Sequence, residues 1–317
     1  MLEDRIRVSI VLLLLSSVLI GCVGMDQKTR SAFESAVKTR YSRFLQVDGT
    51  RIHYYERFSY GVDTSTVVLV HGWMGSAYDF INILGLFPPG FRVIAVDLPG
   101  CGLSEARDNF GYTVESFVSF LKEFIGVLGV REFVLVGHSM GGIIAINFAL
   151  AYPELVERLV LISPDGLKGE EGIWLFFGRL GPITDLLGMM NNRFFVKMGM
   201  RLNVFYDDSK ITEELLDSVA LSALTERGRG AQLKITRNIV GEAHVDALLA
   251  RIDKPTLIIW GKNDGVLSVK WAKKFKEGIK NSRLVVLDKC GHMPMFEKPY
   301  TTIRYINSFL ERRKIGL

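Results

Sequence analysis

A serine between small residues carries the strongest chemical signal in the sequence. Ser139 lies in Gly137-His138-Ser139-Met140-Gly141-Gly142, which follows the apolar run Phe133–Val136 and opens a stretch of helical character. On a sharp turn between a strand and a helix, a serine presents its hydroxyl at the edge of the sheet. Glycines two residues before and after it leave room for the adjoining strand and helix. The pattern predicts that Ser139 is a nucleophile.

A serine hydroxyl needs a base that takes its proton. Of the five histidines, His292 is the best candidate because it follows the last predicted strand, in Cys290-Gly291-His292-Met293-Pro294. Catalytic groups collect at the carboxyl ends of parallel strands, and Gly291 gives the loop the freedom to turn the ring inward. The other four histidines are expected to have structural or surface roles: His53, His71, His138 and His244.

The base in turn needs a carboxylate that fixes its tautomer and stabilises the imidazolium. Asp264, in Gly261-Lys262-Asn263-Asp264, follows the penultimate predicted strand and precedes His292 by one helix and one strand. Asp165, in Ser163-Pro164-Asp165-Gly166, follows the strand before and is the alternative; otherwise it is a turn residue. We expect Asp264 to be the acid, which gives the order Ser, Asp, His along the chain.

Acyl transfer also needs two backbone N–H donors for the charge that forms on the attacked carbonyl oxygen. The residue after the nucleophile, Met140, is predicted to supply one. Trp73, in His71-Gly72-Trp73 directly after the run Thr66–Val70, is predicted to supply the other, with His71 bracing the turn. The loop Asp97–Ser104 is expected to be structural.

These residues require a sheet whose strand ends meet at one edge. The sequence predicts a hairpin at Asp48-Gly49, and short apolar runs that are typical of strands buried on both faces. The predicted strands are Phe44–Val47, Arg51–Phe58, Thr66–Val70, Arg92–Val96, Phe133–Val136, Leu159–Ile162, Thr256–Trp260 and Arg283–Leu287. The helical stretches between them are Val114–Leu128, Gly141–Ala151, Val269–Ile279 and Thr301–Arg312. Such alternation predicts an α/β fold with a mainly parallel sheet and helices on both faces.

One long interval, residues 168–244, breaks the alternation of strands and helices. It is helical in character and rich in large apolar side chains, which include Trp174, Phe176, Phe177, Met189, Met190, Phe194, Phe195, Met198 and Met200. We interpret it as a helical cap inserted over the carboxyl edge of the sheet. The core then comprises residues 44–167 and 245–317.

The N-terminus is not expected to be part of the fold. Val8–Ile20 is an uncharged apolar run, too short for a span of roughly 20 residues but typical of a signal peptide. Its end, Leu19-Ile20-Gly21-Cys22, resembles the lipobox of bacterial lipoproteins. The resemblance implies a signal peptide over residues 1–21 and a lipidated Cys22, and the polar stretch that follows is interpreted as a tether over residues 22–43. The resemblance places the protein in the cell envelope, anchored to a membrane surface and facing away from the cytoplasm. An ordinary cleaved signal or uncleaved anchor, and a cytoplasmic protein, are the alternatives.

Composition excludes several classes of protein. The 317 residues are 48% hydrophobic and 23% charged, which argues against disorder. The net charge is +5, but no basic stripe interleaved with aromatic residues is present, so nucleic acid is not an expected partner. Cys101 and Cys290 are expected to be free thiols, and no metal or other cofactor is predicted.

Together these motifs resemble the α/β-hydrolase superfamily over residues 44–310. The matching segments, in the order and spacing of that family, are His71-Gly72-Trp73, Asp97-Leu98-Pro99-Gly100, Gly137–Gly142, Gly261–Asp264 and Gly291-His292. The resemblance implies an eight-stranded sheet with an inserted helical cap. Within the superfamily the chain looks most like capped esterases, lipases and carbon–carbon bond hydrolases.

The resemblance implies hydrolysis of a carboxylic ester by Ser139, His292 and Asp264 through an acyl-enzyme. Methionines beside the catalytic loops and in the cap favour an apolar, lipid-like acyl group, although they could equally pack the cap against the core. Three alternatives stay open. The first two are cleavage of a carbon–carbon bond in a dienoic diketone and cofactor-free perhydrolysis or acyl transfer. The third is binding without catalysis, which the complete set of triad residues disfavours.

Overall fold

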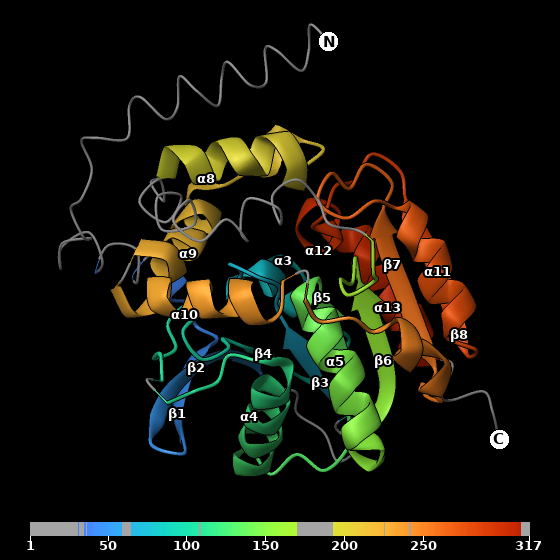
Figure 1. Ribbon diagram of the computed structural model, residues 1–317, viewed down its shortest axis with the longest axis horizontal. Coiled ribbons are helices and arrows are strands. Elements are labelled where there is room, and N and C mark those ends of the chain that lie inside the picture. The colour runs from blue at the N-terminus through green and yellow to red at the C-terminus, as the bar shows by residue number, and fades with distance from the viewer. Residues whose placement is uncertain are drawn as a thin grey trace, which may run out of the picture.

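The computed structural model describes residues 31, 35, 37–58, 65–107, 109–169, 193–224, 226–240 and 242–311, except the side chains of residues 193–195, 223, 224, 226 and 227. Within them, eight strands form one sheet in the order β1-β2-β4-β3-β5-β6-β7-β8 (Figure 1). The β1–β2 and β2–β4 pairs are antiparallel and the rest are parallel. This confirms the predicted fold class. The strands are β1 (Ser42–Val47), β2 (Thr50–Arg57), β3 (Ser65–Val70), β4 (Phe91–Val96), β5 (Phe133–His138), β6 (Val156–Ile162), β7 (Thr256–Gly261) and β8 (Ser282–Leu287).

The central strands are apolar throughout because both faces of the sheet are covered. In β5, Phe133 and Leu135 belong to the core on one face, whereas Val134 and Val136 belong to the core on the other. Successive side chains of a strand point to opposite faces, so a strand between two helical layers needs an unbroken apolar run. An unbroken apolar run in the sequence therefore indicates a strand that is covered on both faces.

Helices cover the two faces of the sheet. Residues of α4 (Val114–Val127), α5 (Met140–Ala151) and α11 (Lys270–Gly278) line one core. Residues of α3 (Ile81–Leu84), α12 (Pro294–Glu297) and α13 (Pro299–Glu311) line the other. Figure 1 shows α4 and α5 in front of the strands. α4 begins where the Thr113 side chain accepts a hydrogen bond from the amide of Ser116, because the first amides of a helix lack intrahelical partners.

The strand order brings two predicted site segments together. β3 lies between β4 and β5 and runs parallel to both. His71-Gly72-Trp73 leaves the carboxyl end of β3, and Ser139 leaves that of the neighbouring strand β5. Neighbouring parallel strands end at the same edge, which is where open α/β sheets bind their ligands.

The described part of the predicted cap is helical. It comprises α8 (Arg193–Gly199), the π-helical turn η4 (Met200–Val204), the short 3₁₀ turn η5 (Asp208–Lys210), α9 (Glu213–Leu224) and α10 (Glu226–Asn238). The Gly102 amide donates to the Ser222 hydroxyl at 2.8 Å, and the Gly265 amide donates to the Asn203 carbonyl at 3.1 Å. Gly102 follows β4 and Gly265 follows β7, so these helices lie at the carboxyl ends of the strands (Figure 1).

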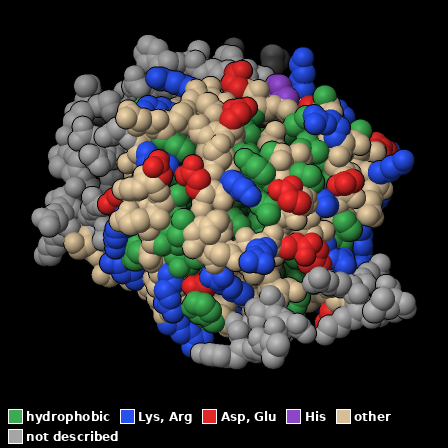
Figure 2. All heavy atoms as spheres, turned by 90° about the horizontal axis from the view of Figure 1, so that it is seen from below, with side chains coloured by type: hydrophobic (Ala, Val, Ile, Leu, Met, Phe, Trp, Pro, Cys, Tyr) green, Lys and Arg blue, Asp and Glu red, His purple; other side chains and the backbone are tan. Residues whose placement is uncertain are grey.

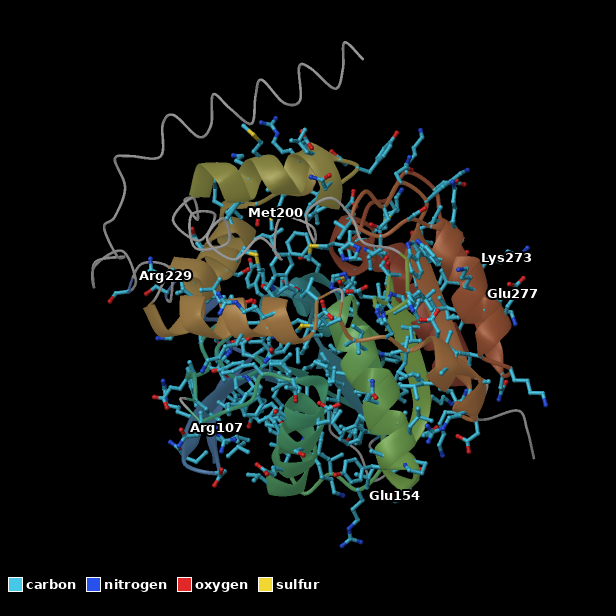
Figure 3. All side chains as sticks on the ribbon, viewed as in Figure 1. Arg107, Glu154, Met200, Arg229, Lys273 and Glu277 are labelled. Carbon is cyan, nitrogen blue, oxygen red and sulfur yellow. The ribbon has the colours of Figure 1, made fainter. Side chains whose placement is uncertain are left out.

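Apolar side chains of the cap join the core of the sheet. Met200, labelled below α8 in Figure 3, is buried in one cluster with Leu216, Leu287 and Met293. For these residues, packing of the cap against the core explains the apolar character. Met198, also part of the cap prediction, is half-buried. Seven other apolar residues of that prediction lie outside the described residues or have undescribed side chains: Trp174, Phe176, Phe177, Met189, Met190, Phe194 and Phe195.

The predicted signal peptide, residues 1–21, and Cys22 lie outside the described residues. The end of the predicted tether, residues 22–43, belongs to the fold, which corrects that boundary. Val37 is buried, and its carbonyl accepts a hydrogen bond from the Tyr55 hydroxyl. β1 begins at Ser42 because that residue already pairs with Tyr55 of β2.

The described residues bear on four features of the sequence: membrane spans, surface charge, thiols and metal-ligand clusters. No helix in the described part of the chain is long and apolar enough to cross a bilayer. On the face shown in Figure 2, Lys and Arg side chains are interspersed with Asp and Glu. Cys101 and Cys290 are buried free thiols. The described ranges hold no cluster of three metal-ligating side chains.

Candidate active site

Ser139 lies on a strained turn between β5 and α5. Its backbone angles are φ 51° and ψ −121°, a conformation that is rare for a residue with a side chain. The turn is fixed by the Ser139 amide, which donates to the Ile162 carbonyl at 3.1 Å, and by the Ser139 carbonyl, which accepts from the Gly142 and Asp165 amides. A turn of this kind between a strand and a helix presents a serine hydroxyl at the edge of the sheet.

Two of the flanking glycines are required by close backbone approaches. A Cβ atom on Gly137 would lie 2.3 Å from the Gly141 carbonyl oxygen, and one on Gly141 would lie 2.3 Å from the Val70 carbonyl oxygen. Both distances are far shorter than a van der Waals contact. The small residues predicted around Ser139 therefore let α5 pack directly on β5 and on the end of β3.

His292 and Asp264 form the predicted pair. His292 Nδ1 lies 2.8 Å from Asp264 Oδ2, and the Asp264 side chain is fully buried. The other carboxylate oxygen, Oδ1, accepts the Val266 and Leu267 amides, each at 2.9 Å. Because an ionised carboxylate only accepts, His292 donates through Nδ1 and keeps the lone pair of Nε2 for a proton. This is the tautomer that a general base needs.

Asp165, the alternative acid, makes a different contact. Its Oδ1 accepts the amide of the next residue, Gly166, at 2.7 Å, as a turn residue does. Burial raises the pKa of Asp165, which favours the neutral form. No hydrogen bond joins Asp165 to His292 among the described residues, so the geometry favours Asp264.

Within the described residues, the hydroxyl of Ser139 makes no hydrogen bond to His292. His138, the residue before Ser139, contacts His292 instead. The His138 and His292 ring centroids are 4.8 Å apart, and His138 Nε2–H donates to the His292 carbonyl at 2.9 Å. Burial lowers the pKa of His138 well below its usual value, which keeps it neutral. Catalytic hydrogen bonds are often long in unliganded enzymes and tighten when substrate binds. Sequence reasoning assigned His138 no contact with the base.

The predicted oxyanion donors lie beside Ser139. A Cβ atom on Gly72 would lie 2.9 Å from Ser139 Cβ, so the backbone after β3 passes directly over the serine. Met140 is the first residue of α5, and the first amides of a helix have no intrahelical acceptor. In the described part of the chain, neither the Trp73 nor the Met140 amide has a hydrogen-bond partner. Both are therefore free to bind an oxyanion.

Comparison with known proteins identifies the family of the chain. A model of the α/β hydrolase fold matches residues 65–299. The chain belongs to the α/β-hydrolase family. The uncharacterised hydrolase YugF of Bacillus subtilis is 32% identical over 272 residues, which cover 85% of this chain and 97% of YugF.

Two further proteins, one found by sequence and one by structure, are similar to the chain. A 2-hydroxy-6-oxononadienedioate/2-hydroxy-6-oxononatrienedioate hydrolase of Pseudomonas putida is 32% identical over 288 residues, which cover 85% of this chain and 96% of that enzyme. The crystal structure of a bacterial membrane phospholipase A superposes with a TM-score of 0.75 at 24% identity, covering 98% of both chains. At that identity the superposition shows a common fold.

A hydrogen-bond network supports the oxyanion segment, residues 71–73, which carries the proposed donor Trp73. Asp97 Oδ1 accepts the Ala77 amide at 2.6 Å, and Oδ2 lies 2.7 Å from Nδ1 of buried His53. Burial alone would raise the pKa of Asp97, but the adjacent His53 lowers it. Asp97 thus ties the loop after β4 to β2 and to the segment after β3, in agreement with a structural role for Asp97–Ser104.

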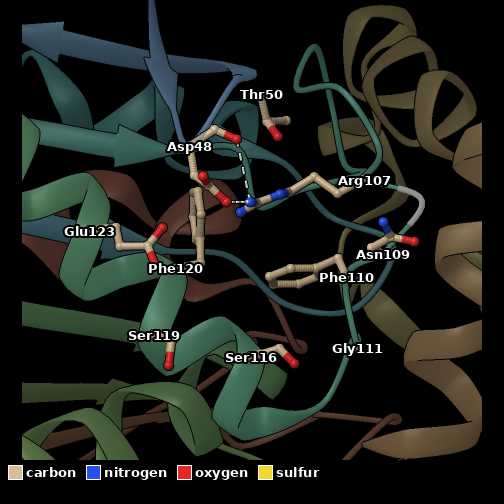
Figure 4. Close-up of a pocket in the computed structure, with 10 residues that line it drawn as sticks. All are labelled: Asp48, Thr50, Arg107, Asn109, Phe110, Gly111, Ser116, Ser119, Phe120 and Glu123. Atoms are coloured by element: carbon tan, nitrogen blue, oxygen red, sulfur yellow. Dashed lines mark hydrogen bonds and ion pairs between the residues drawn. The ribbon is translucent and has the colours of Figure 1, made fainter.

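A hollow in the described surface is separate from the candidate site. It lies at the turn between β1 and β2 and beside α4, and Arg107 pairs with Asp48 at its rim (Figure 4). None of the predicted catalytic residues lines it. The lining residues are Asp48, Thr50, Arg107, Asn109, Phe110, Gly111, Ser116, Ser119, Phe120 and Glu123.

Proposed function

We propose that this α/β hydrolase cleaves carboxylic esters, with Ser139 as nucleophile, His292 as base and Asp264 as the acid that orients it. The hydrogen bond between His292 and Asp264 carries the proposal, because it leaves Nε2 unprotonated on a loop that His138 links to Ser139. A hydrolase with this constellation needs no cofactor for acyl transfer.

In the proposed reaction, Ser139 Oγ attacks the ester carbonyl carbon while His292 Nε2 takes the hydroxyl proton. The Trp73 and Met140 amides stabilise the negative carbonyl oxygen of the tetrahedral intermediate. The bond to the alcohol breaks as His292 returns the proton to the leaving oxygen, which leaves an acyl-enzyme. A water molecule then gives its proton to His292 and attacks the acyl carbon, and the carboxylic acid leaves as Ser139 regains its proton.

An uncharged, apolar acyl group suits the described surroundings of the site. Met140 and Met293, next to the proposed nucleophile and base, are buried, and methionine adapts to irregular apolar shapes. None of the Lys or Arg side chains in the described residues is buried. A carboxylate on the acyl group would have no buried cation as partner there, and an unpaired buried charge is strongly unfavourable.

Cleavage of a carbon–carbon bond is the second candidate. It is favoured by the 32% identity to the Pseudomonas putida hydrolase, whose name specifies a dienedioate substrate. Such a substrate carries two carboxylates, for which Lys and Arg side chains are the strongest partners. Because the described residues offer no buried Lys or Arg, we place ester hydrolysis first.

We also propose that the protein is a lipoprotein of the cell envelope, lipidated on Cys22. The apolar run Val8–Ile20 before Gly21-Cys22 supports this location. An enzyme anchored at a membrane surface meets lipid esters, in agreement with an apolar acyl group. Mass spectrometry of the mature N-terminus tests it: a diacylated Cys22 is expected, and an unmodified chain that still begins at Met1 would exclude it.

The first prediction concerns the nucleophile. Ser139→Ala should abolish hydrolysis of p-nitrophenyl esters, because loss of a triad nucleophile lowers kcat by about 10⁶ in a serine protease. Acyl chains of two to sixteen carbons should be compared, with the longer, apolar ones preferred. Ser119→Ala, at an exposed position of α4, is the matched control and should retain full activity.

A dienoic diketone with terminal carboxylates should be assayed beside the esters. Ester turnover that disappears in Ser139→Ala, with no turnover of the diketone, supports the first candidate. Turnover of the diketone alone would establish the second candidate. Equal ester turnover by the wild type and by Ser139→Ala would refute the assignment of Ser139.

A further inference from the structure

The carboxylate of Glu297 connects two segments that are far apart in the sequence. Glu297 ends α12 and is 6% exposed. Its Oε1 accepts the Gly291 amide at 2.6 Å, next to the proposed base. Its Oε2 accepts the amides of Tyr206 and Asp207, in the cap, at 2.9 and 3.1 Å. One side chain thus holds the backbone of the His292 loop with one oxygen and the backbone of the cap with the other.

The same cap segment makes direct backbone contacts with both loops of the proposed pair. The His292 amide donates to the Val204 carbonyl at 2.7 Å, and the Gly265 amide donates to the Asn203 carbonyl at 3.1 Å. Gly265 directly follows Asp264. Residues 203–207 therefore contact the loop of the proposed base and the loop of the proposed acid. Glu297 adds hydrogen bonds to Tyr206, Asp207 and Gly291 at the same junction.

The close fit explains why residue 291 is glycine. A Cβ atom there would lie 2.3 Å from the Val204 carbonyl oxygen, 2.8 Å from Glu297 Oε1 and 2.9 Å from the Tyr206 nitrogen. Any side chain would push the cap segment, Glu297 and the His292 loop apart. The sequence suggested conformational freedom as the reason for Gly291, but its φ lies outside the region that favours glycine. The junction with the cap explains the residue instead.

Backbone amides, rather than a cation, balance the charge of Glu297. No Lys, Arg or His pairs with Glu297 among the described residues. Burial raises the pKa of Glu297, and the three amides act in the opposite direction. A carboxylate can accept several N–H donors at once, whereas an amide side chain of the same shape has one acceptor oxygen.

We infer that Glu297 is a positioning residue that sets the location of the His292 ring by clamping the His292 loop to the cap. The inference rests on the proposed role of His292 as a base. It has a functional consequence: the base is placed correctly only when residues 203–207 of the cap are docked. Cap position and catalytic competence are then coupled through one carboxylate.

A merely structural role for Glu297 makes a different prediction, and Glu56 supplies the comparison. Glu56 is also buried, at 3% exposure, and it forms an ion pair with Arg92. The two residues belong to β2 and β4, toward the opposite end of the sheet from β7 and β8. Glu56→Gln should lower stability by weakening a buried ion pair, without moving the His292 loop. Glu56→Gln therefore measures how the loss of a buried carboxylate affects stability and activity when the His292 loop is not involved.

The experiment compares Glu297→Gln with Glu56→Gln in the full-length protein, at a temperature at which circular dichroism shows both to be folded. For a short p-nitrophenyl ester, Glu297→Gln should lower kcat by about 10- to 100-fold, since a displacement of about 1 Å can lower the rate about 100-fold. KM should change by less than about threefold, because the clamp does not contact substrate. Glu56→Gln should retain kcat. Equal kcat values for the two variants would overturn the inference.

The backbone of the cap provides a second route if Glu297→Gln does not fold. Tyr206→Pro removes one N–H donor to Glu297, and the preceding residue, Phe205, already has the extended conformation that proline requires of its neighbour. Tyr206→Ala keeps the amide and reports the loss of the ring alone. The kcat of Tyr206→Pro should be about tenfold below that of Tyr206→Ala. Equal kcat values would overturn the clamp.

A spectroscopic measurement separates failure of this inference from failure of the proposed function. The proton that His292 Nδ1 shares with Asp264 should give a downfield NMR resonance in the wild type, whatever the substrate. Glu297→Gln should shift or broaden it, and Glu56→Gln should not. If the wild type hydrolyses no ester, the proposed function fails while this resonance still tests the clamp. An unchanged resonance in Glu297→Gln would refute the clamp.

Discussion

At the scale of single residues, the ring of His71 determines the direction of a proposed oxyanion donor. The Leu98 amide donates to His71 Nε2 at 3.1 Å, so the ring proton is on Nδ1, which donates to the Gly72 carbonyl at 2.8 Å. The carbonyl of Gly72 and the N–H of Trp73 belong to one planar peptide and point in opposite directions. Fixing the carbonyl therefore fixes the Trp73 N–H. Burial lowers the pKa of His71, which keeps Nε2 available as an acceptor.

Replacing His71 should therefore lower kcat and leave KM nearly unchanged. Loss of an oxyanion donor lowers kcat by about 10²–10³-fold. A misdirected donor should have a smaller effect, so we expect His71→Ala to lower kcat about 10- to 100-fold. His71→Asn keeps a donor near the position of Nδ1 and should recover part of the loss. Steady-state kinetics on one ester decide this, and a raised KM at unchanged kcat would contradict it.

Residues whose proposed role rests on their own side-chain chemistry stand in recognisable motifs, whereas residues that act on distant backbone do not. Ser139 and His292 stand in motifs whose neighbours, glycines above all, reveal the turn they occupy. Glu297 instead binds amides 90 and 91 positions away, and His138 binds a carbonyl 154 positions away. Any residue type offers such an amide or carbonyl, so the sequence around the contact contains no signal for it.

At the scale of elements, the strands were predicted well because burial on both faces leaves an unbroken apolar run. β6 begins at Val156, before the predicted Leu159, because the half-buried Glu157 and Arg158 interrupt that run without ending the strand. The short helical turns Ala77–Phe80 and Ile81–Leu84 were missed because neither is long enough to show a helical period. The arrangement of the cap depends on contacts with three loops, which follow β4, β7 and β8. No local sequence pattern encodes these contacts.

The junction of α5 with β3 predicts that Gly141 cannot be replaced. Gly141→Ala would place a Cβ 2.3 Å from the Val70 carbonyl oxygen and 2.6 Å from that of His71, so it should displace the oxyanion segment. We expect a loss of about 1–3 kcal/mol or more in the free energy of unfolding, as for overpacking, together with a loss of activity.

Gly126→Ala is the matched control. Gly126 is an exposed residue of α4, and a Cβ there meets nothing within 4 Å. Because alanine is the better helix former, this variant should gain about 0.5–1 kcal/mol and keep full activity. Urea unfolding of both variants measures the two changes. A Gly141→Ala variant as stable and active as Gly126→Ala would contradict the packing described for the elbow.

At the scale of the whole molecule, groups buried in their neutral form control how stability depends on pH. His71 and His138 have pKa values lowered by burial. Asp79, close to the oxyanion segment and 3% exposed, has a pKa raised by burial to about 8. At neutral pH all three are neutral in the folded protein, whereas the unfolded chain ionises its aspartates and begins to protonate its histidines near pH 6.5.

The two histidines and Asp79 give slopes of opposite sign. Below pH 6.5 the unfolded state binds more protons at the histidines, so stability falls as pH decreases. Between the ordinary pKa of Asp79, 3.8, and its folded value of about 8, the folded state binds the extra proton, so stability falls as pH rises. On the acid side the two histidines act against Asp79, and above pH 6.5 Asp79 alone of these three groups sets the slope.

Asp79→Asn should therefore remove the alkaline decline, because asparagine reproduces the shape of the neutral acid and cannot ionise. Between pH 7 and pH 9 the free energy of unfolding of the wild type should fall by roughly 1–2 kcal/mol, since one pKa unit corresponds to about 1.4 kcal/mol. Asp79→Asn should stay level over this range. Asp253→Asn, at an exposed position, should follow the wild type. Urea unfolding at each pH measures the slopes, and parallel curves for the wild type and Asp79→Asn would show that Asp79 is already ionised at neutral pH.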